Sequence, residues 1–182
     1  MNLNLSDERT LIEGCKKGEP QARKQLYELY SGTMFALCLR YAPDKDSAED
    51  ILQEGFITVF TKIGDYSGKG SIEGWMRKIF ITRALQEIRA KQIAKRYLEQ
   101  AENEIIAEEV KLSVLDEISA KEIMDCIAEL PAGYRTVFNL FAVEGYPHAE
   151  IARMLNIGES TSRSQYAHAR KMLQEKLKNL NK

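Results

Sequence analysis

Few side chains in this sequence have the types and spacing that catalysis or metal binding requires. The only histidines are His148 and His168, and the cysteines Cys15, Cys38 and Cys126 lie far apart, without a metal-like spacing. No nucleophile stands in a recognisable arrangement with a base. The sequence therefore predicts no enzyme, no metal and no cofactor. It also predicts that the three thiols are buried among apolar neighbours.

The strongest local pattern indicates binding instead, and it covers residues 147–170. Apolar residues at Ile151 and Leu155, followed by a tight turn at Asn156 and Gly158, are typical of a helix-turn-helix. A second helix is expected directly after the turn. Its outward face carries short polar and cationic side chains that can reach base edges and phosphates, namely Ser160, Arg163, Ser164, His168 and Lys171. The alternative is an ordinary helical hairpin with a solvated face.

A helix expected from Ser47 to Ile63 exposes an acidic face. Asp50 and Glu54 are four residues apart, so they share one side of this helix, where their like charges repel each other. This repulsion favours a basic partner for the face. The alternative is a solvated acidic face, since Asp and Glu are also common near a helix N-terminus.

Residues 62–96 carry nine Lys or Arg against three Asp or Glu, with aromatic residues interleaved. Lys78, Thr82 and Arg89 fall along one helical face that suits a nucleic-acid backbone. Polar and aromatic residues of the preceding loop can hold an unstacked base of a single strand. Trp75 has two interpretations, because with its apolar neighbours it also fits a helix core.

The elements that must position these residues are all expected to be helices. Helical spacing recurs along the chain, and no alternating stretch is long enough for a convincing strand. Helix starts are expected at Ser6, at Pro20 and at Asp46 or Ser47, and a helix end at Gly64. No apolar run approaches the ~20 residues of a membrane span, and no secretory signal is evident. We therefore expect an all-α protein in the cytoplasm, without membrane insertion.

Charge is unevenly distributed along the chain, although the formal net charge is −1. Residues 1–96 carry a net charge of +3 and residues 131–182 a net charge of +4, whereas residues 97–130 carry −8. Two basic modules that flank an acidic segment suggest that both ends of the chain face nucleic acid. We therefore expect two small helical domains, over 1–96 and 119–182, joined by an acidic linker over 97–118.

Three segments resemble bacterial RNA polymerase sigma factors of the extracytoplasmic-function (ECF) group, in the order in which that family has them. The family's polymerase-binding helix is similar to SAEDILQEGFITVF, which begins at Ser47. Its promoter-melting segment is similar to the stretch from Gly68 to Lys91, and its −35-reading domain is similar to Leu130–Leu173. The amino-acid sequence of this last motif resembles that of family members from the Bacteroidetes. The resemblance spans nearly the whole chain.

The resemblance implies a sigma-2-like helical bundle, a sigma-4-like helix-turn-helix domain and roles for particular residues. A clamp surface of core RNA polymerase would meet Asp50, Gln53 and Glu54. The −10 element and the melted strand would meet Tyr66, Ser67, Lys69, Ser71, Trp75, Lys78, Thr82 and Arg89. The −35 major groove would meet Ser160, Thr161, Arg163, Ser164, Ala167, His168 and Lys171. The implied partners are core polymerase, promoter DNA and an anti-sigma factor.

The sequence departs from the family pattern at three positions. Thr82 stands where many members have asparagine, His168 where an arginine is common, and Ser162 where a buried valine or isoleucine is usual. These changes affect the expected promoter sequence and not the class of protein. The second candidate function is a conventional helix-turn-helix regulator whose N-terminal half senses a ligand or forms a dimer. It leaves the acidic helix, the basic segment and the acidic linker without a shared purpose.

Overall fold

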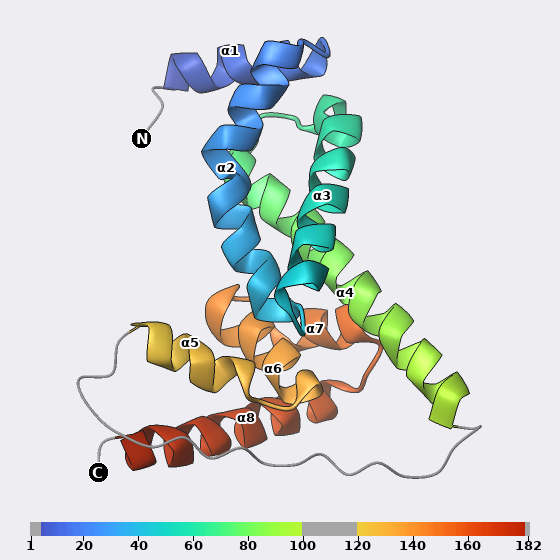
Figure 1. The fold of residues 1–182 in the computed structure, drawn as a ribbon, viewed down its shortest axis with the longest axis vertical. Coiled ribbons are helices and arrows are strands. Elements are labelled where there is room, and N and C mark those ends of the chain that lie inside the picture. Colours follow the sequence, from blue (N-terminus) through green and yellow to red (C-terminus); the bar gives the residue numbers. More distant parts are fainter. Residues whose placement is uncertain (1–4, 100–119, 181–182) are drawn as a thin grey trace. The chain divides into compact units, whose positions relative to one another are not determined.

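The computed structural model describes residues 5–99 and 120–180, and all regular structure within these two ranges is helical (Figure 1). The predicted all-α fold class is therefore confirmed. None of the helices in these ranges is long and apolar enough to cross a membrane. In chain order the elements are α1 (Leu5–Lys16), α2 (Pro20–Tyr41), α3 (Lys45–Lys62), the 3₁₀ turn η1 (Ile63–Asp65), α4 (Ile72–Glu99), α5 (Ala120–Ala128), α6 (Ala132–Phe138), the π-helical turn η2 (Asn139–Val143), α7 (His148–Leu155) and α8 (Glu159–Leu180).

Two compact units divide the chain, Met1–Ala94 and Lys95–Lys182. The acidic linker predicted over 97–118 lies outside the described residues, except where α4 continues to Glu99. The exact domain borders therefore stay predictions, and the two units are described one at a time.

The helix starts of the first unit agree only in part with the predicted capping residues. Pro20 occupies the first turn of α2, as predicted. A backbone N–H at this position would have no acceptor within the helix, so proline loses nothing by lacking one, and its fixed φ angle suits a helix. The cap of α3 is Asp44, and the prediction of Asp46 or Ser47 is wrong. Asp44 has an extended backbone, so its Oδ1 reaches forward and accepts a hydrogen bond from the Ser47 amide at 2.7 Å.

Two more predicted helix ends lie inside helical turns. Helix α1 begins at Leu5, so Ser6 lies within the helix and is not its cap. Gly64 lies within η1, which continues the chain beyond α3. A glycine that stops a helix adopts a left-handed backbone, and Gly64 does not have it; the first glycines after α3 with that conformation are Gly68 and Gly70.

The core of the first unit depends on a close approach of α3 to α4. A Cβ atom at Gly55 would lie 2.2 Å from Cε1 of Phe80, so glycine is required at this crossing. The Phe80 ring then packs edge-on against Phe56 at a centroid distance of 5.3 Å. Fully buried side chains of α2, α3 and α4 include Leu26, Met34, Leu37, Val59, Met76 and Ile81. This packing fixes which faces of α3 and α4 point outward.

The second unit is a helix-turn-helix in which α6 and α7 both pack on α8. The turn after α7 is made by Asn156, whose left-handed backbone (φ 55°) ends the helix as the sequence predicts. A small apolar cluster joins α5 and the residue Leu130 after it to α8. Its buried members are Cys126, Ile127, Leu130, Ala169 and Leu173. Because these residues hold the inner face of α8, its polar face is left exposed.

Candidate nucleic-acid and protein interfaces

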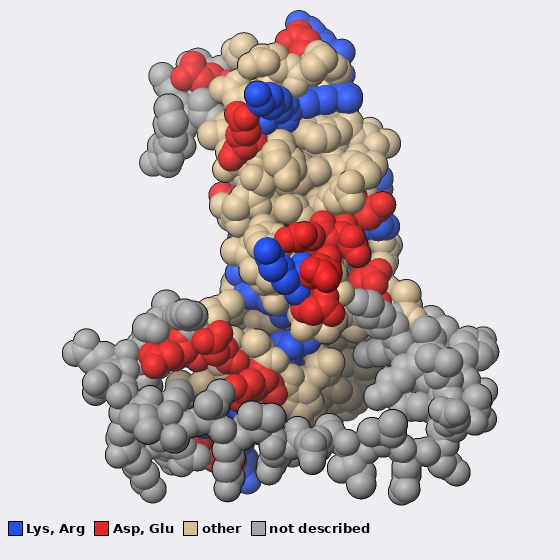
Figure 2. All heavy atoms as spheres, in the orientation of Figure 1, with Lys and Arg blue, Asp and Glu red and all other residues tan. Residues whose placement is uncertain are grey.

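The first candidate surface is the outer face of the N-terminal half of α3. Asp50, Gln53 and Glu54 are all exposed, and Figure 2 shows acidic atoms gathered over this part of the first unit. Glu54 also has a partner within the chain, because its Oε2 accepts a hydrogen bond from Nη2 of Arg83 at 3.0 Å. These two side chains are 55% and 37% exposed. Water therefore screens the pair, and the carboxylate stays accessible to a partner.

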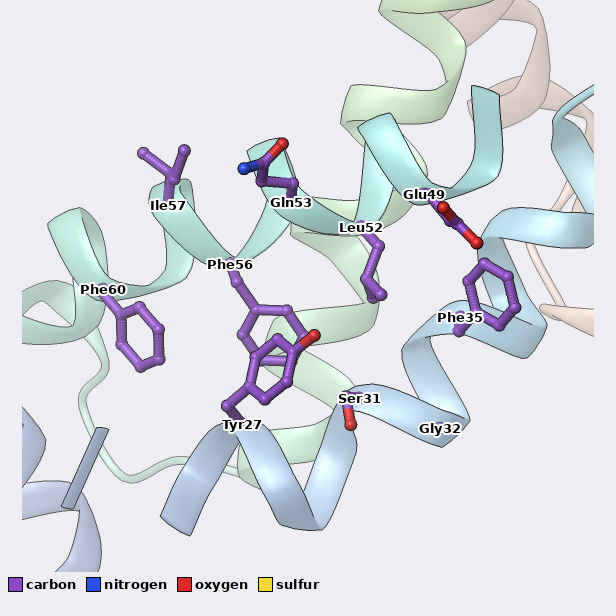
Figure 3. Close-up of a pocket in the computed structure, with 10 residues that line it drawn as sticks. All are labelled: Tyr27, Ser31, Gly32, Phe35, Glu49, Leu52, Gln53, Phe56, Ile57 and Phe60. Atoms are coloured by element: carbon purple, nitrogen blue, oxygen red, sulfur yellow. The ribbon is translucent and has the colours of Figure 1, made fainter. Parts of the chain in front are cut away.

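An apolar groove with a volume of about 750 Å³ lies beside this face, between α2 and α3 (Figure 3). The rings of Tyr27 and Phe56 meet across it from the two helices, with centroids 4.7 Å apart. Tyr27 and Ile57 are 43% and 53% exposed, so large apolar side chains line an open surface. The lining residues are Tyr27, Ser31, Gly32, Phe35, Glu49, Leu52, Gln53, Phe56, Ile57 and Phe60.

The groove was not predicted from the sequence, although Gln53 belongs to it. Phe56 and Phe60 fit the apolar stripe of the helix, and that stripe alone does not tell a buried residue from one that lines a groove. The sequence signal that could have found it is Ile57, an isoleucine outside the stripe. The groove and the acidic face together form one continuous candidate surface for a protein partner.

The loop between η1 and α4 is shaped by Tyr66. Its ring is 5% exposed and lies 5.6 Å from the ring of Trp75, which is half-buried. The Tyr66 hydroxyl donates a hydrogen bond to the Gly70 carbonyl at 2.7 Å. Burial, with a smaller contribution from the Glu8 carboxylate, raises the pKa of this phenol, so the hydroxyl keeps its proton. Tyr66 therefore holds the loop from inside and is not open for direct stacking on a base.

Other predicted loop residues are exposed. Ser67 and Lys69 lie on the outside of the loop, and the left-handed backbone of Gly68 and Gly70 turns the chain around them. Ser71 is also exposed, but its Oγ accepts a hydrogen bond from the Gly74 amide at 3.0 Å, which caps α4. The loop is thus held at both ends, with one cation and one hydroxyl pointing outward.

Helix α4 presents the predicted polar face next to this loop. Lys78, Thr82 and Arg89 are all exposed. The Thr82 hydroxyl donates a hydrogen bond to the Lys78 carbonyl at 2.8 Å, which leaves its methyl group and an oxygen lone pair for a partner. The three side chains share one side of the helix, as their spacing predicts.

Helix α8 exposes all of the predicted −35 residues, namely Ser160, Thr161, Arg163, Ser164, Ala167, His168 and Lys171. The Arg163 guanidinium forms an ion pair with Glu159 one turn earlier. The Ser164 hydroxyl donates a hydrogen bond to the Thr161 carbonyl at 3.0 Å. His168 stacks on the ring of Tyr134 from α6, at a centroid distance of 5.6 Å. The structure thus brings these side chains together on one open face.

The buried polar residue of α8 has a partner that the sequence did not predict. Ser162 is completely buried, as expected for its position, and its Oγ is hydrogen-bonded to Nδ1 of His148 at 2.9 Å. The imidazole also stacks on Phe141, with centroids 4.2 Å apart. A serine is tolerated at this apolar position because its hydroxyl does not lose hydrogen bonding on burial.

The cysteines are buried and unpaired, as predicted. Burial raises the pKa of the Cys38 thiol to about 12, so this group stays protonated at neutral pH. Within residues 5–99 and 120–180, no group of three His, Cys, Asp or Glu side chains is placed to hold a metal ion.

The fold and these surfaces define the class of protein. It is a helical protein of two units, one with an acidic face beside an apolar groove and the other with a helix-turn-helix. The family model of Sigma-70 region 2 matches residues 26–94, and that of Sigma-70, region 4 matches residues 120–173. The chain therefore belongs to the sigma-70 family of RNA polymerase sigma factors, in its ECF group. It binds core RNA polymerase and directs transcription initiation.

Two relatives match the amino-acid sequence of this chain over almost their whole length. The RNA polymerase sigma-H factor of Pseudomonas aeruginosa is 24% identical over 189 residues, which cover 98% of this chain and 97% of the relative. The ECF RNA polymerase sigma factor SigW of Bacillus subtilis is 27% identical over 181 residues, which cover 93% and 96%. The Bacteroidetes type is not tested by these comparisons and stays a prediction.

Solved structures agree in fold. The sigma factor RpoE in complex with the anti-sigma factor NepR from Bartonella quintana has a TM-score of 0.55 at 20% identity, over 85% of this chain and 96% of that chain. CnrH in complex with the cytosolic domain of CnrY has a TM-score of 0.50 at 19% identity, over 94% and 97%. These likenesses support the two helical units.

Proposed function

We propose that the two units of this sigma factor divide polymerase binding and promoter recognition between three surfaces. The acidic face of α3 and its groove hold core polymerase. The loop over 66–71 and the outer face of α4 hold the −10 element and the melted strand. Helix α8 reads the −35 element. The observation that carries the proposal is the exposure of three chemically distinct surfaces on separate elements, at α3, at the loop with α4, and at α8.

The polymerase surface combines an apolar centre with a charged rim, which is typical of protein interfaces. Tyr27 and Ile57 would supply apolar contact area in the centre. Asp50, Gln53 and Glu54 would lie at the rim and select a basic partner surface. A rim of this kind mainly sets specificity and the rate of association, whereas the apolar centre supplies most of the affinity.

The −10 surface would capture a single strand. Lys69, Lys78 and Arg89 would meet backbone phosphates, and Ser67 and Thr82 offer hydrogen bonds to an unstacked base. Tyr66 contributes by fixing the shape of the loop, since its ring is buried. Trp75 lies beside it and is half-buried, and the Ser71 hydroxyl caps the start of α4.

The −35 surface would lie in a major groove, as the second helix of a helix-turn-helix does. Arg163 and Lys171 would contact phosphates and supply affinity for any sequence. His168 would contact a base and supply sequence preference, with Ser164 and Ala167 beside it. Ser160 and Thr161, in the first turn of α8, would approach the phosphates next to the groove.

Three finer statements complete the proposal. The protein has no enzymatic activity of its own and acts in the cytoplasm. An anti-sigma factor binds the surfaces that would otherwise meet polymerase. Support for this partner comes from the fold, because two solved proteins of similar fold are in complexes with CnrY and the anti-sigma factor NepR. An apolar groove on the polymerase surface would suit a helix of such a partner.

Fluorescence anisotropy with and without core polymerase tests the proposal. At physiological salt, the isolated full-length protein should show negligible specific binding to promoter duplex, because each small unit makes few phosphate contacts. Adding core polymerase should produce tight promoter binding, since two weak contacts become one multivalent engagement. Nanomolar promoter binding by the protein alone would instead favour a conventional regulator. In-vitro transcription with core polymerase then maps the start sites.

A further inference from the structure

The His168 ring does not project freely from α8. Its plane lies within 18° of the Tyr134 ring plane, at a centroid distance of 5.6 Å, which is an offset-stacked geometry. His168 itself is exposed, whereas Tyr134 is half-buried. The imidazole therefore rests on a protein surface while its remaining edge stays open to a partner.

Tyr134 is itself held firmly. It packs against the apolar cluster that joins α5 to α8 and contains Leu130, Ala169 and Leu173. One turn further along α6, Phe138 stacks on Tyr166 at 6.0 Å, with planes 20° apart. Helix α6 is thus fixed along α8 by two successive ring contacts, and the Tyr134 ring forms a rigid support.

A fixed imidazole plane matters for reading a base. Hydrogen bonds weaken steeply away from linear geometry, and imidazole has only two ring nitrogens, in the plane of the ring. An arginine, which is common at this position in the family, offers five donors on a longer stem and tolerates more orientations. If the histidine side chain sampled several rotamers, binding would restrict it to one of them, and this loss of conformational entropy would lower the affinity for DNA.

We propose that Tyr134 is a positioning residue for His168, and that it sharpens the base preference of α8 by holding the imidazole in one orientation. This rests on the proposed −35 role of His168. Tyr134 acts through the histidine and makes no base contact of its own. The pair would therefore behave as one specificity unit contributed by two helices.

The test is a selection from a −35 library, using full-length variants assembled with core polymerase. His168→Ala should lose preference at one base position. Tyr134→Phe keeps the ring and should choose the same bases as the unmodified protein. Tyr134→Leu should lower the preference at that same position by roughly two- to tenfold, the range expected for loss of one aromatic pair. Preference at the other positions is the internal control. The double variant Tyr134→Leu/His168→Ala should match His168→Ala alone.

Each other outcome overturns a stated part of this reasoning. Unchanged preference in Tyr134→Leu, with an effect in His168→Ala, overturns the positioning role only. Altered preference in Tyr134→Phe, or a further loss in the double variant, indicates a direct contact by Tyr134 and also overturns it. Unchanged preference in His168→Ala overturns the proposed base contact and the positioning role together.

A measurement without DNA keeps the proposal falsifiable if Tyr134→Leu weakens the fold of the second unit. Tyr134→Met is the second variant, since its flexible side chain fills the same cavity. In either folded variant, the imidazole protons of His168 should lose the ring-current shift that stacking produces in the NMR spectrum. Retention of that shift would overturn the stacking contact itself.

Discussion

Reversing two charges on α3 should separate polymerase binding from folding. In the variant Asp50→Lys/Glu54→Lys, we expect co-elution with core RNA polymerase to be abolished while the helix content stays near that of the unmodified protein. The change removes the ion pair between Glu54 and Arg83, whose side chains are 55% and 37% exposed. A screened pair of this kind contributes about 0.2–1 kcal/mol. The lysine introduced at position 54 also faces the Arg83 guanidinium, and this exposed like-charge contact costs a few tenths of a kcal/mol more.

The stability cost is therefore on the order of 1 kcal/mol, which for a domain of this size is a few degrees in Tm. Two like charges facing a basic partner cost several kcal/mol of binding free energy, or more than a hundredfold in Kd. The variant should thus lose core polymerase binding while it still folds. The assay is size-exclusion chromatography with core enzyme at physiological salt, with thermal unfolding followed by circular dichroism.

A charge swap provides the decisive variant. Glu54→Arg combined with Arg83→Glu restores an intramolecular ion pair with opposite polarity, so stability should return while core binding stays lost. The matched control is Glu13→Lys on α1, which also removes a surface pair, with Lys16 at 3.4 Å, and should leave core binding intact. Undiminished co-elution of the double-lysine variant would refute the assignment. Restored binding in the swap would show that Glu54 acts only through Arg83.

The remaining predictions concern the second unit, the core and the thiols. Arg163→Ala should lower promoter affinity for all sequences alike and reduce its salt dependence, whereas His168→Ala should relax one base position by ~1–3 kcal/mol, as a −35 selection would show. Gly55→Ala should destabilise the protein by about 1–3 kcal/mol in urea unfolding, because the added methyl group meets an aromatic ring of α4. The matched change Gly32→Ala, at an open helical site, should be stabilising. Cys38 should resist alkylation at pH 8 until the protein unfolds, because burial keeps its thiol protonated; rapid labelling of the native protein would contradict its burial.

Much of this protein could be predicted from local spacing alone. The apolar period of 3.6 residues indicates which side of a helix is buried, so the exposed faces that carry Asp50, Lys78 and Arg163 were predicted from the sequence. The turn at Asn156 could also be predicted from the sequence, because asparagine is one of the few residues that adopt a left-handed backbone at low cost. The burial of Ser162, by contrast, was expected from the resemblance to the sigma factor family, in which a buried valine or isoleucine is usual at this position.

The tertiary structure decided which of these residues meet. Tyr66 was expected on the DNA surface, and its ring instead packs inside the loop that it supports. The ion pair of Glu54 joins residues 29 positions apart, and the stacking of His168 on Tyr134 joins two different helices. Periodicity determines the buried face of each helix, but the residues that meet across two helices depend on how their side-chain ridges interlock and at what angle they cross. That geometry is a property of the whole core and is not encoded in any one segment.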